Sequence, residues 1–223
     1  MTSLTQLKTD LARDLSDPDS NTFSDAVLGD LINAGLADIG RIAPQPYQED
    51  ITVTADTLTY DLASAYFAEP NRDVEVVRVE VWDETTTPMK FVARLTPAAT
   101  QYANQSDAGW KVWNGTLYLT NSMEAALVVG QHLLRVWGYA PYPALTDDTD
   151  TVDLPSALEQ ALREYGQSRG YARLQNSRAL FTQWQTASNN SDVSFGQLLS
   201  LKSEASQQWE RRRRQLYEMR EMP

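Results

Sequence analysis

The sequence has 223 residues, with no cysteine and a single histidine, His132. Without cysteine there can be no disulfide, thiolate nucleophile or iron–sulfur cluster, and one imidazole cannot build a multi-histidine metal site. A Ser-His-Asp triad would have to use His132, which we expect to pack on a strand face beside Leu134 and Val136. The composition therefore argues against an enzyme and against a bound cofactor.

Long apolar runs are also missing. The longest run, from Ala125 to Gly130, is far shorter than the ~18–20 residues that cross a bilayer. The first residues contain neither the basic nor the apolar segment of a secretory signal. We therefore expect a soluble protein that makes no contact with a membrane.

Charge is abundant but uneven. The net charge is −11, which disfavours a dedicated DNA-binding surface, since such surfaces neutralise phosphates with lysine and arginine. Residues 155–223 hold ten Lys or Arg and seven Asp or Glu, which leaves +3, whereas residues 1–154 carry −14. An acidic body with a basic end suits head-to-tail contacts between different surfaces, although the basic end could also be a solvated helix face.

Two amphipathic helices are predicted near the N-terminus. Leucines recur every three or four residues over 3–15, and a second apolar helical face follows Ser24, a good N-cap residue. Pro44 ends the second helix, so the pair forms an αα-hairpin. The loop between them, Asp17-x-Asp19-x-Asn21, resembles the start of a calcium site but lacks the later glycine and glutamate. We expect an ordinary loop there.

From about residue 50 the apolar spacing changes to the two-residue period of strands. Asn114-Gly115 predicts a type I′ hairpin, with Val112 opposite Leu117. The valines of 74–82 change face midway, which indicates a β-bulge. We expect five or six antiparallel strands in this block and one helical turn capped by Thr96.

Helical spacing returns after Pro155 and is broken only by the polar stretch 188–191. Strands segregated from helices are typical of an α+β fold. We expect a helical core, formed by the N-terminal αα-hairpin and two long C-terminal helices, with a central antiparallel β insertion. The expected parts of this one composite domain are the hairpin (1–49), the insertion (50–140), a loop and long helix that complete the core (141–190), and a C-terminal docking helix or tail (191–223).

Two charged clusters are the remaining candidates for chemistry. Four aspartates before the third helix could hold a divalent ion, but we favour a solvated loop whose last acid caps that helix; they are Asp147, Asp148, Asp150 and Asp153. The run Arg211 to Arg214 points around the whole helix axis, so it does not form one stripe for a DNA groove. Tryptophan, tyrosine and methionine flank it, and with arginine these types are enriched at interface centres. We favour docking to an acidic partner over nucleic-acid binding.

Three segments follow one another in an order that resembles the phage head–tail adaptor proteins, also called head completion or connector proteins. They are Phe23 to Ala34, Leu133 to Pro143, and Leu145 to Leu162. The resemblance implies a virion structural protein at the head–tail interface, assembled in the host cytoplasm. It would form a dodecameric ring under the portal, extend the DNA channel, and join the head to stopper or tail proteins. Double-stranded DNA would pass without specific binding, because a lumen lined by acids repels it.

The resemblance also assigns roles to residues. The portal-docking interface would comprise Trp209, Arg211, Arg212, Arg213, Arg214, Leu216, Tyr217 and Met219. The aspartates of 147–153 would line an acidic lumen or lie in an inter-subunit loop. Deletion of 209–223 is then expected to leave a folded subunit that no longer assembles on portal rings. The alternatives are another ring-forming tail or baseplate protein, a nucleic-acid-binding module that uses Arg211–Arg214, and an enzyme with an unrecognised carboxylate pair.

Overall fold

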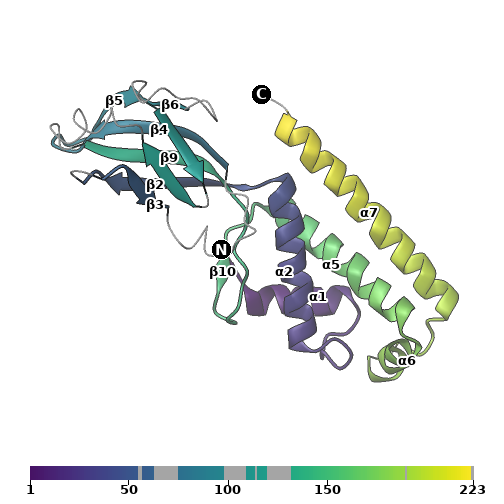
Figure 1. Cartoon of the computed structure of the whole chain (residues 1–223). Coiled ribbons are helices and arrows are strands. Elements are labelled where there is room, and N and C mark those ends of the chain that lie inside the picture. The colour runs from purple at the N-terminus through teal and green to yellow at the C-terminus, as the bar shows by residue number, and fades with distance from the viewer. Residues whose placement is uncertain are drawn as a thin grey trace. The chain divides into compact units, whose positions relative to one another are not determined.

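A computed structural model describes most of the chain, namely residues 1–54, 57–62, 75–97, 109–113, 115–119, 132–188 and 190–221. The chain divides into two compact units (Figure 1). The helical unit combines Met1–Ala43 with Tyr142–Pro223, and the β unit is Pro44–Pro141. Helices and strands are thus segregated along the chain, and the expected α+β class with a β insertion is confirmed.

The helical unit is built from five described helices and one short strand pair. The helices are α1 (Leu4–Asp14), α2 (Asp25–Ile42), α5 (Ser156–Asn176), α6 (Arg178–Ala187) and α7 (Phe195–Glu221), and the strands are β1 (Thr2–Ser3) and β10 (Thr151–Val152). The Ser24 hydroxyl accepts from Val27 N at the start of α2, so the predicted N-cap is present.

The helical unit differs from expectation at Ser177. We expected one helix from Pro155 to the polar stretch near 188, but Ser177 is extended, with φ −134° and ψ 105°. Its side chain accepts from Leu180 N at 3.3 Å and caps the start of α6. The continuous helical spacing concealed this break, because the serine lies among good helix formers.

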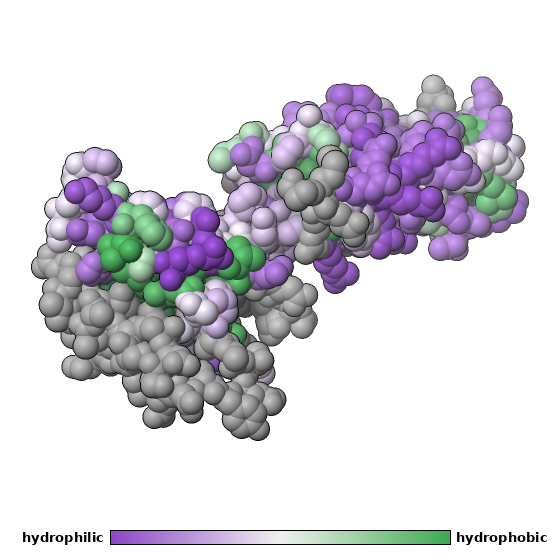
Figure 2. Space-filling model, turned by 90° about the horizontal axis from the view of Figure 1, so that it is seen from above, coloured by the Kyte–Doolittle hydropathy of each residue, from purple (hydrophilic) through white to green (hydrophobic). Residues whose placement is uncertain are grey.

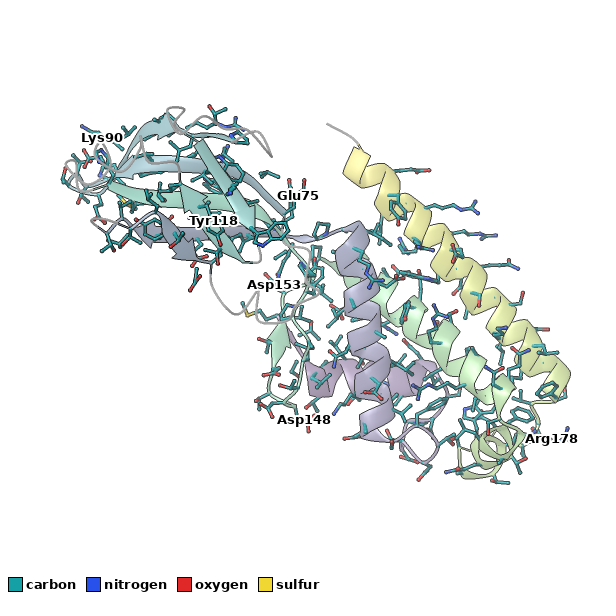
Figure 3. The ribbon with its side chains drawn as sticks, in the orientation of Figure 1. Glu75, Lys90, Tyr118, Asp148, Asp153 and Arg178 are labelled. Atoms are coloured by element: carbon teal, nitrogen blue, oxygen red, sulfur yellow. The ribbon has the colours of Figure 1, made fainter. Side chains whose placement is uncertain are left out.

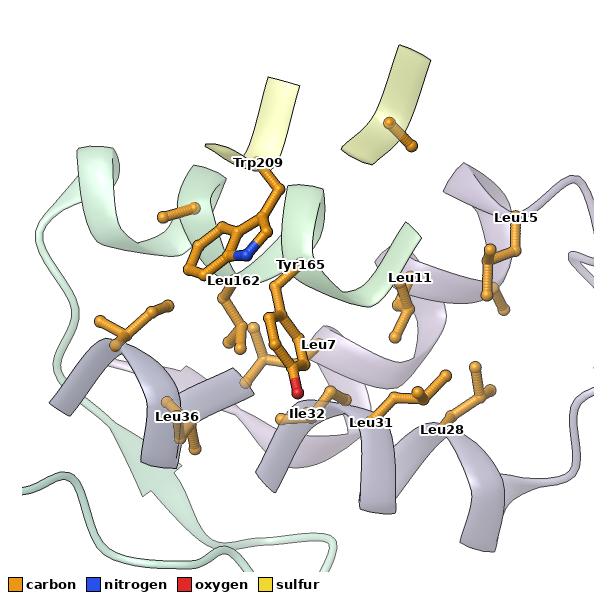
Figure 4. Packing of buried hydrophobic residues seen from close by; sticks show 14 of the residues in the cluster. Leu7, Leu11, Leu15, Leu28, Leu31, Ile32, Leu36, Leu162, Tyr165 and Trp209 are labelled. Atoms are coloured by element: carbon orange, nitrogen blue, oxygen red, sulfur yellow. The ribbon is translucent and has the colours of Figure 1, made fainter. Parts of the chain in front are cut away.

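The core of the helical unit is mainly aliphatic. Leucines of α1 and α2 pack against α5, and Trp209 of α7 closes the cluster (Figure 4). Gly166 and Gly170 of α5 permit this approach, since a Cβ would lie 2.6 Å from Leu11 Cδ1 and 2.5 Å from Leu15 Cδ2, respectively. The four-residue glycine spacing therefore serves close helix packing.

The described residues of the β unit form two four-stranded sheets. The first has the order β2-β9-β4-β5 and the second β3-β8-β7-β6. Their bounds are β2 (Gln45–Thr52), β3 (Thr59–Asp61), β4 (Glu75–Asp83), β5 (Lys90–Arg94), β6 (Thr96–Pro97), β7 (Gly109–Trp113), β8 (Thr116–Leu119) and β9 (His132–Ala140).

Local features of the β unit follow the sequence closely. The β7–β8 hairpin pairs Val112 with Leu117, and Gly115 has the positive φ of 76° that a tight turn requires. The register of β4 against β9 shifts between Val76 and Arg78, which confirms the bulge. The prediction of a helical turn at Thr96 was wrong, because Thr96–Pro97 pairs in parallel with β7.

Both sheets share one hydrophobic cluster. Val79 and Leu134 of the first sheet and Leu117 of the second are fully buried in it. The chain passes between the sheets at one edge, where β5 leads through Leu95 into β6. It passes again at the other edge, where β2 leads towards β3. The unit is therefore a small sandwich with connected edges, and its first sheet has one face turned away from this cluster.

Candidate interaction surfaces

The end of α7 carries the residues expected to dock on a portal, and two of them are buried in the subunit itself. Trp209 is 5 % exposed, and its ring meets Tyr165 of α5 edge-on with centroids 5.3 Å apart. Leu216 is 1 % exposed. Both side chains belong to the core of the helical unit, so neither is available to a partner of the folded subunit.

The four arginines of this segment diverge as the 100° helical step requires. Arg212 forms an ion pair with Glu164 of α5, at 3.2 Å between Nη2 and Oε1. The Arg213 guanidinium lies 5.9 Å from the Tyr217 ring centroid. Arg211 and Arg214 are exposed. Arg212 therefore holds α7 to α5, the described contacts of Arg213 lie within α7, and Arg211 and Arg214 face solvent.

We define the outer α7 surface as Arg211, Arg214 and Tyr217. Tyr217 is 43 % exposed. The side chain of Met219 lies outside the described residues. Truncation at 209 would remove two core side chains and the Arg212–Glu164 pair. The deletion would therefore change the core of the subunit as well as its docking surface. That the truncated subunit remains folded stays a prediction, and point substitutions on the outer α7 surface are the sharper probe of docking.

The acidic loop before α5 is organised around Asp150. Its Oδ2 accepts from Thr146 N at 2.7 Å and from Asp147 N at 2.8 Å. These backbone hydrogen bonds, that of Asp147 first, lower the pKa of the Asp150 carboxyl below its ordinary value. The carboxylate is therefore committed to holding the loop closed.

The same loop also holds the start of α1. Lys8 Nζ lies 2.7 Å from Asp148 Oδ1. The backbone carbonyl of Asp150 accepts from Leu4 N at 2.9 Å, and that of Asp148 accepts from Thr5 Oγ1 at 3.0 Å. The first N–H groups of a helix have no partner within it, and this loop satisfies two of them, because the Asp148 carbonyl also accepts from Thr5 N at 3.4 Å.

The remaining acid, Asp153, does not cap α5. The N-cap position is Pro155, without a side-chain hydrogen bond, and the Asp153 carboxylate lies 3.7 Å from the N-terminal amino group. Across the described residues, no group of three or more His, Cys, Asp or Glu side chains is placed to hold a metal ion. The loop therefore has a structural arrangement, and its predicted place in a lumen or between subunits stays a prediction.

The calcium-like loop is organised in a different way. Asp17 is fully buried, and its carboxylate accepts from the backbone N–H groups of Asn21, Thr22 and Phe23 at 3.1, 2.9 and 2.8 Å. The Ser188 hydroxyl also donates to it. The oxygens that a cation would need are engaged by the protein, so this is a hydrogen-bonded loop, as we expected.

Two further sequence observations concern His132 and the apolar runs. His132 begins β9 opposite Asp83 and is half-buried. In the part of the chain that is described, no helix combines the length and apolar character that a membrane crossing requires.

Comparison with known proteins identifies the family. A family model described as SU10 adaptor protein matches residues 2–217. No curated protein matches the chain. The family match covers both units and nearly all of α7, in agreement with the resemblance drawn from the three sequence segments. The chain belongs to the SU10 adaptor protein family, and it is a phage structural protein that works with other head and tail proteins of the virion.

Proposed function

We propose that this chain is a head–tail adaptor whose copies form a ring under the portal. The ring would extend the DNA channel and join the head to stopper or tail proteins. The family match over residues 2–217 is the observation that carries this proposal. The net charge of −11 supports a channel wall that DNA passes without binding, because acids repel the phosphate backbone.

The outer α7 surface is the proposed contact with the portal. Arg211 and Arg214 are exposed, and neither has a hydrogen bond or ion pair with a described residue. Their guanidinium groups can therefore pair with acidic groups of another protein. Tyr217 adds an exposed aromatic ring beside them. Arginine and tyrosine are among the residues that contribute most when truncated at interface centres.

A matched pair of charge reversals tests this contact. Arg211→Glu/Arg214→Glu changes the outer α7 surface, and Arg173→Glu/Arg178→Glu makes the same change in charge at two exposed arginines of α5 and α6. Arg178 lies at the end of the helical unit opposite the C-terminal end of α7 (Figure 3). Both proteins should remain folded by circular dichroism. Binding to purified portal rings should be weakened at least tenfold (~1.4 kcal/mol) only in the first.

Electron microscopy of the wild-type protein with portal rings examines the assembly itself. Twelvefold rings stacked on the portal would support the adaptor role. Rings of another symmetry that do not bind the portal would favour a tail or baseplate component instead. Equal portal binding by the two double variants would refute the docking role of α7 and leave the adaptor role standing.

A further inference from the structure

The first sheet of the β unit carries aromatic side chains on the face turned away from its core. Val79, Val81, Leu134 and Val136 face the hydrophobic cluster, and the alternate residues of β4 and β9 face the other way. The outward set includes Trp82, Trp137 and Tyr139. The solvent face of an antiparallel sheet is normally polar, so this composition needs a reason.

A row of alternating charges crosses this face. Asp50, Arg135, Glu80 and Arg94 are successive cross-strand partners on β2, β9, β4 and β5. Arg135 donates to both Asp50 oxygens at 2.6 Å. This pair raises the pKa of Arg135, chiefly through the hydrogen bonds to Asp50. Asp50 and Arg135 are therefore firmly paired with each other, and Glu80 forms its ion pair with Arg78 of the same strand, at 3.1 Å.

The aromatic rings are fixed by the same charges. The Glu80 carboxylate accepts from the indole N–H of Trp82 at 3.0 Å and from that of Trp137 at 2.8 Å. Arg135 lies over Trp82 at 4.5 Å, and Arg78 lies over Trp137 at 4.7 Å. Glu80 is 8 % exposed. Because each group holds the next, the side chains of this face are already ordered. They therefore lose little conformational entropy when a partner binds.

One guanidinium group on this face is available to a binding partner. Arg94, at the end of the row, is exposed and has no hydrogen bond or ion pair with a described residue. Together with Arg78 it lines a surface hollow whose walls include Trp137, Tyr139 and Pro46. Tyr139 is 44 % exposed. The Arg78 guanidinium is already paired with Glu80, at 3.1 Å between Nε and Oε1. The Arg94 guanidinium, beside these aromatic walls, is suited to a carboxylate carried on a short side chain.

The exposed side chains confirm that this face is not purely polar. Phe91 of β5 is 54 % exposed and packs edge-on against Trp82 at 6.0 Å. Figure 2 shows hydrophobic residues gathered on the β unit directly beside strongly hydrophilic ones. Aromatic residues and arginine are enriched at the centres of protein interfaces. We name this surface, around Arg78, Arg94 and Tyr139, the arginine–aromatic face.

We propose that the arginine–aromatic face docks a second copy of this chain, an inference that rests on the proposed ring. The chain itself supplies the anionic partner, because its net charge is −11. The complementary surface is the outer side of α2, where Asp30 is exposed and Asp38 is half-exposed. Neither carboxylate has a hydrogen bond or ion pair with a described residue. Ala34 and Ala37 lie exposed between them, so the arginines of the next copy can approach closely.

This contact joins two different surfaces of identical chains. Such a heterologous contact repeats from copy to copy and closes into a ring when the rotation permits. Electrostatic complementarity sets its register, since like charges placed opposite each other oppose binding. The arginine–aromatic face and the outer side of α2 would thus supply the lateral contact between subunits, separate from the outer α7 surface.

Charge exchange tests the contact with the protein alone. Self-association of the full chain is measured by sedimentation velocity over concentrations up to the solubility limit. Arg94→Glu would place an acid opposite Asp30 of the neighbour, and Asp30→Arg would place a second cation opposite Arg94. Each variant should associate at least about tenfold more weakly than wild type. Lys111→Glu, an exposed change of equal charge on the second sheet, should associate like wild type.

The decisive measurement is the association of the Arg94→Glu and Asp30→Arg variants when they are mixed. In an assembly that alternates the two variants, the acid introduced by Arg94→Glu meets the guanidinium introduced by Asp30→Arg. The other contact joins the unchanged Arg94 of one variant to the unchanged Asp30 of the other. Association should therefore return. Association unchanged by either variant, no recovery on mixing, or a wild-type protein that stays monomeric throughout would overturn the proposal. Portal binding by the same variants is scored separately, so a failed lateral contact is distinguishable from a failed adaptor role.

Discussion

The helical unit and the β unit both bury tryptophan, as Trp110 shows for the β unit, but only the β unit also holds tryptophans in order on an outer face. In the helical unit Trp184 and Trp209 are buried, and the surface seen in Figure 2 is mostly hydrophilic. In the β unit Trp82 and Trp137 lie on the outer face of a sheet and are held there by Glu80. The helical unit therefore uses its tryptophans for its own stability, whereas the β unit keeps an ordered aromatic surface that faces outward.

The largest expected effect comes from removing Trp209. Trp209→Ala leaves a cavity against Tyr165 and should lower the free energy of unfolding by ~3–5 kcal/mol. Chemical denaturation followed by circular dichroism measures this loss. Trp113→Ala removes a tryptophan of the β unit that is 73 % exposed, and it should change stability by no more than about 0.5 kcal/mol. Similar losses in the two proteins would contradict the assignment of Trp209 to the core.

The second expected effect concerns the buried carboxylate of the helical unit. Asp17→Ala leaves three backbone N–H groups without their acceptor, and should cost about 3 kcal/mol. Asp19→Ala, two residues away and exposed, is the matched control and should be neutral within about 0.5 kcal/mol. Added calcium should stabilise neither the wild type nor the variants. A calcium-dependent rise in melting temperature would disprove the account of this loop.

The third prediction concerns Gly138, where β9 lies very close to the backbone of β4. A Cβ on Gly138 would lie 2.3 Å from the Glu75 carbonyl oxygen, beside the bulge in β4. Gly138→Ala should therefore destabilise the β unit by about 2 kcal/mol. Amide hydrogen exchange should show the loss in β4 and β9 and not in α5. In α7, a Cβ on Gly196 would meet only the Ser194 hydroxyl, at an ordinary contact distance of 3.8 Å, so Gly196→Ala should stabilise the helix by ~0.5–1 kcal/mol.

The smallest effect is a pH dependence in the acidic loop. The folded pKa of Asp150 lies below its ordinary value, so the carboxylate stabilises the fold above that ordinary value of ~4. This contribution is lost as the pH falls through the folded pKa. Carbon NMR titration should show the lowered pKa. The stability difference between wild type and Asp150→Asn should shrink in acid, and a difference independent of pH would argue against the proposed loop closure.

Local sequence patterns predicted the local structure well. Asn-Gly between alternating residues gave the β7–β8 register, and the valine phase change located the bulge at Val77. The break at Ser177 was missed because neither proline nor glycine marks it. Helical spacing placed Trp209 and Leu216 on the apolar stripe of α7, but spacing does not tell whether the same subunit or a partner covers that stripe.

The arginine–aromatic face could not be predicted from the sequence. Its charge row requires the strand order β2-β9-β4-β5, in which neighbours in space are far apart along the chain. Asp50 and Arg135 are separated by 85 residues, and Trp137 and Glu80 by 57. Single-sequence patterns report which residues share a strand face, but the partner across the ladder is fixed only when the sheet assembles.

The β unit is inserted between the two segments of the helical unit, and this order has a consequence for synthesis on the ribosome. The described strands of the β unit lie between Pro44 and Pro141, so all of them are synthesised before α5. The first two helices can gain their core contacts with α5 and α7 only after these later helices emerge. During that interval they are exposed to chaperones and to wrong partners, and the speed of translation through the last third of the chain governs how long the interval lasts.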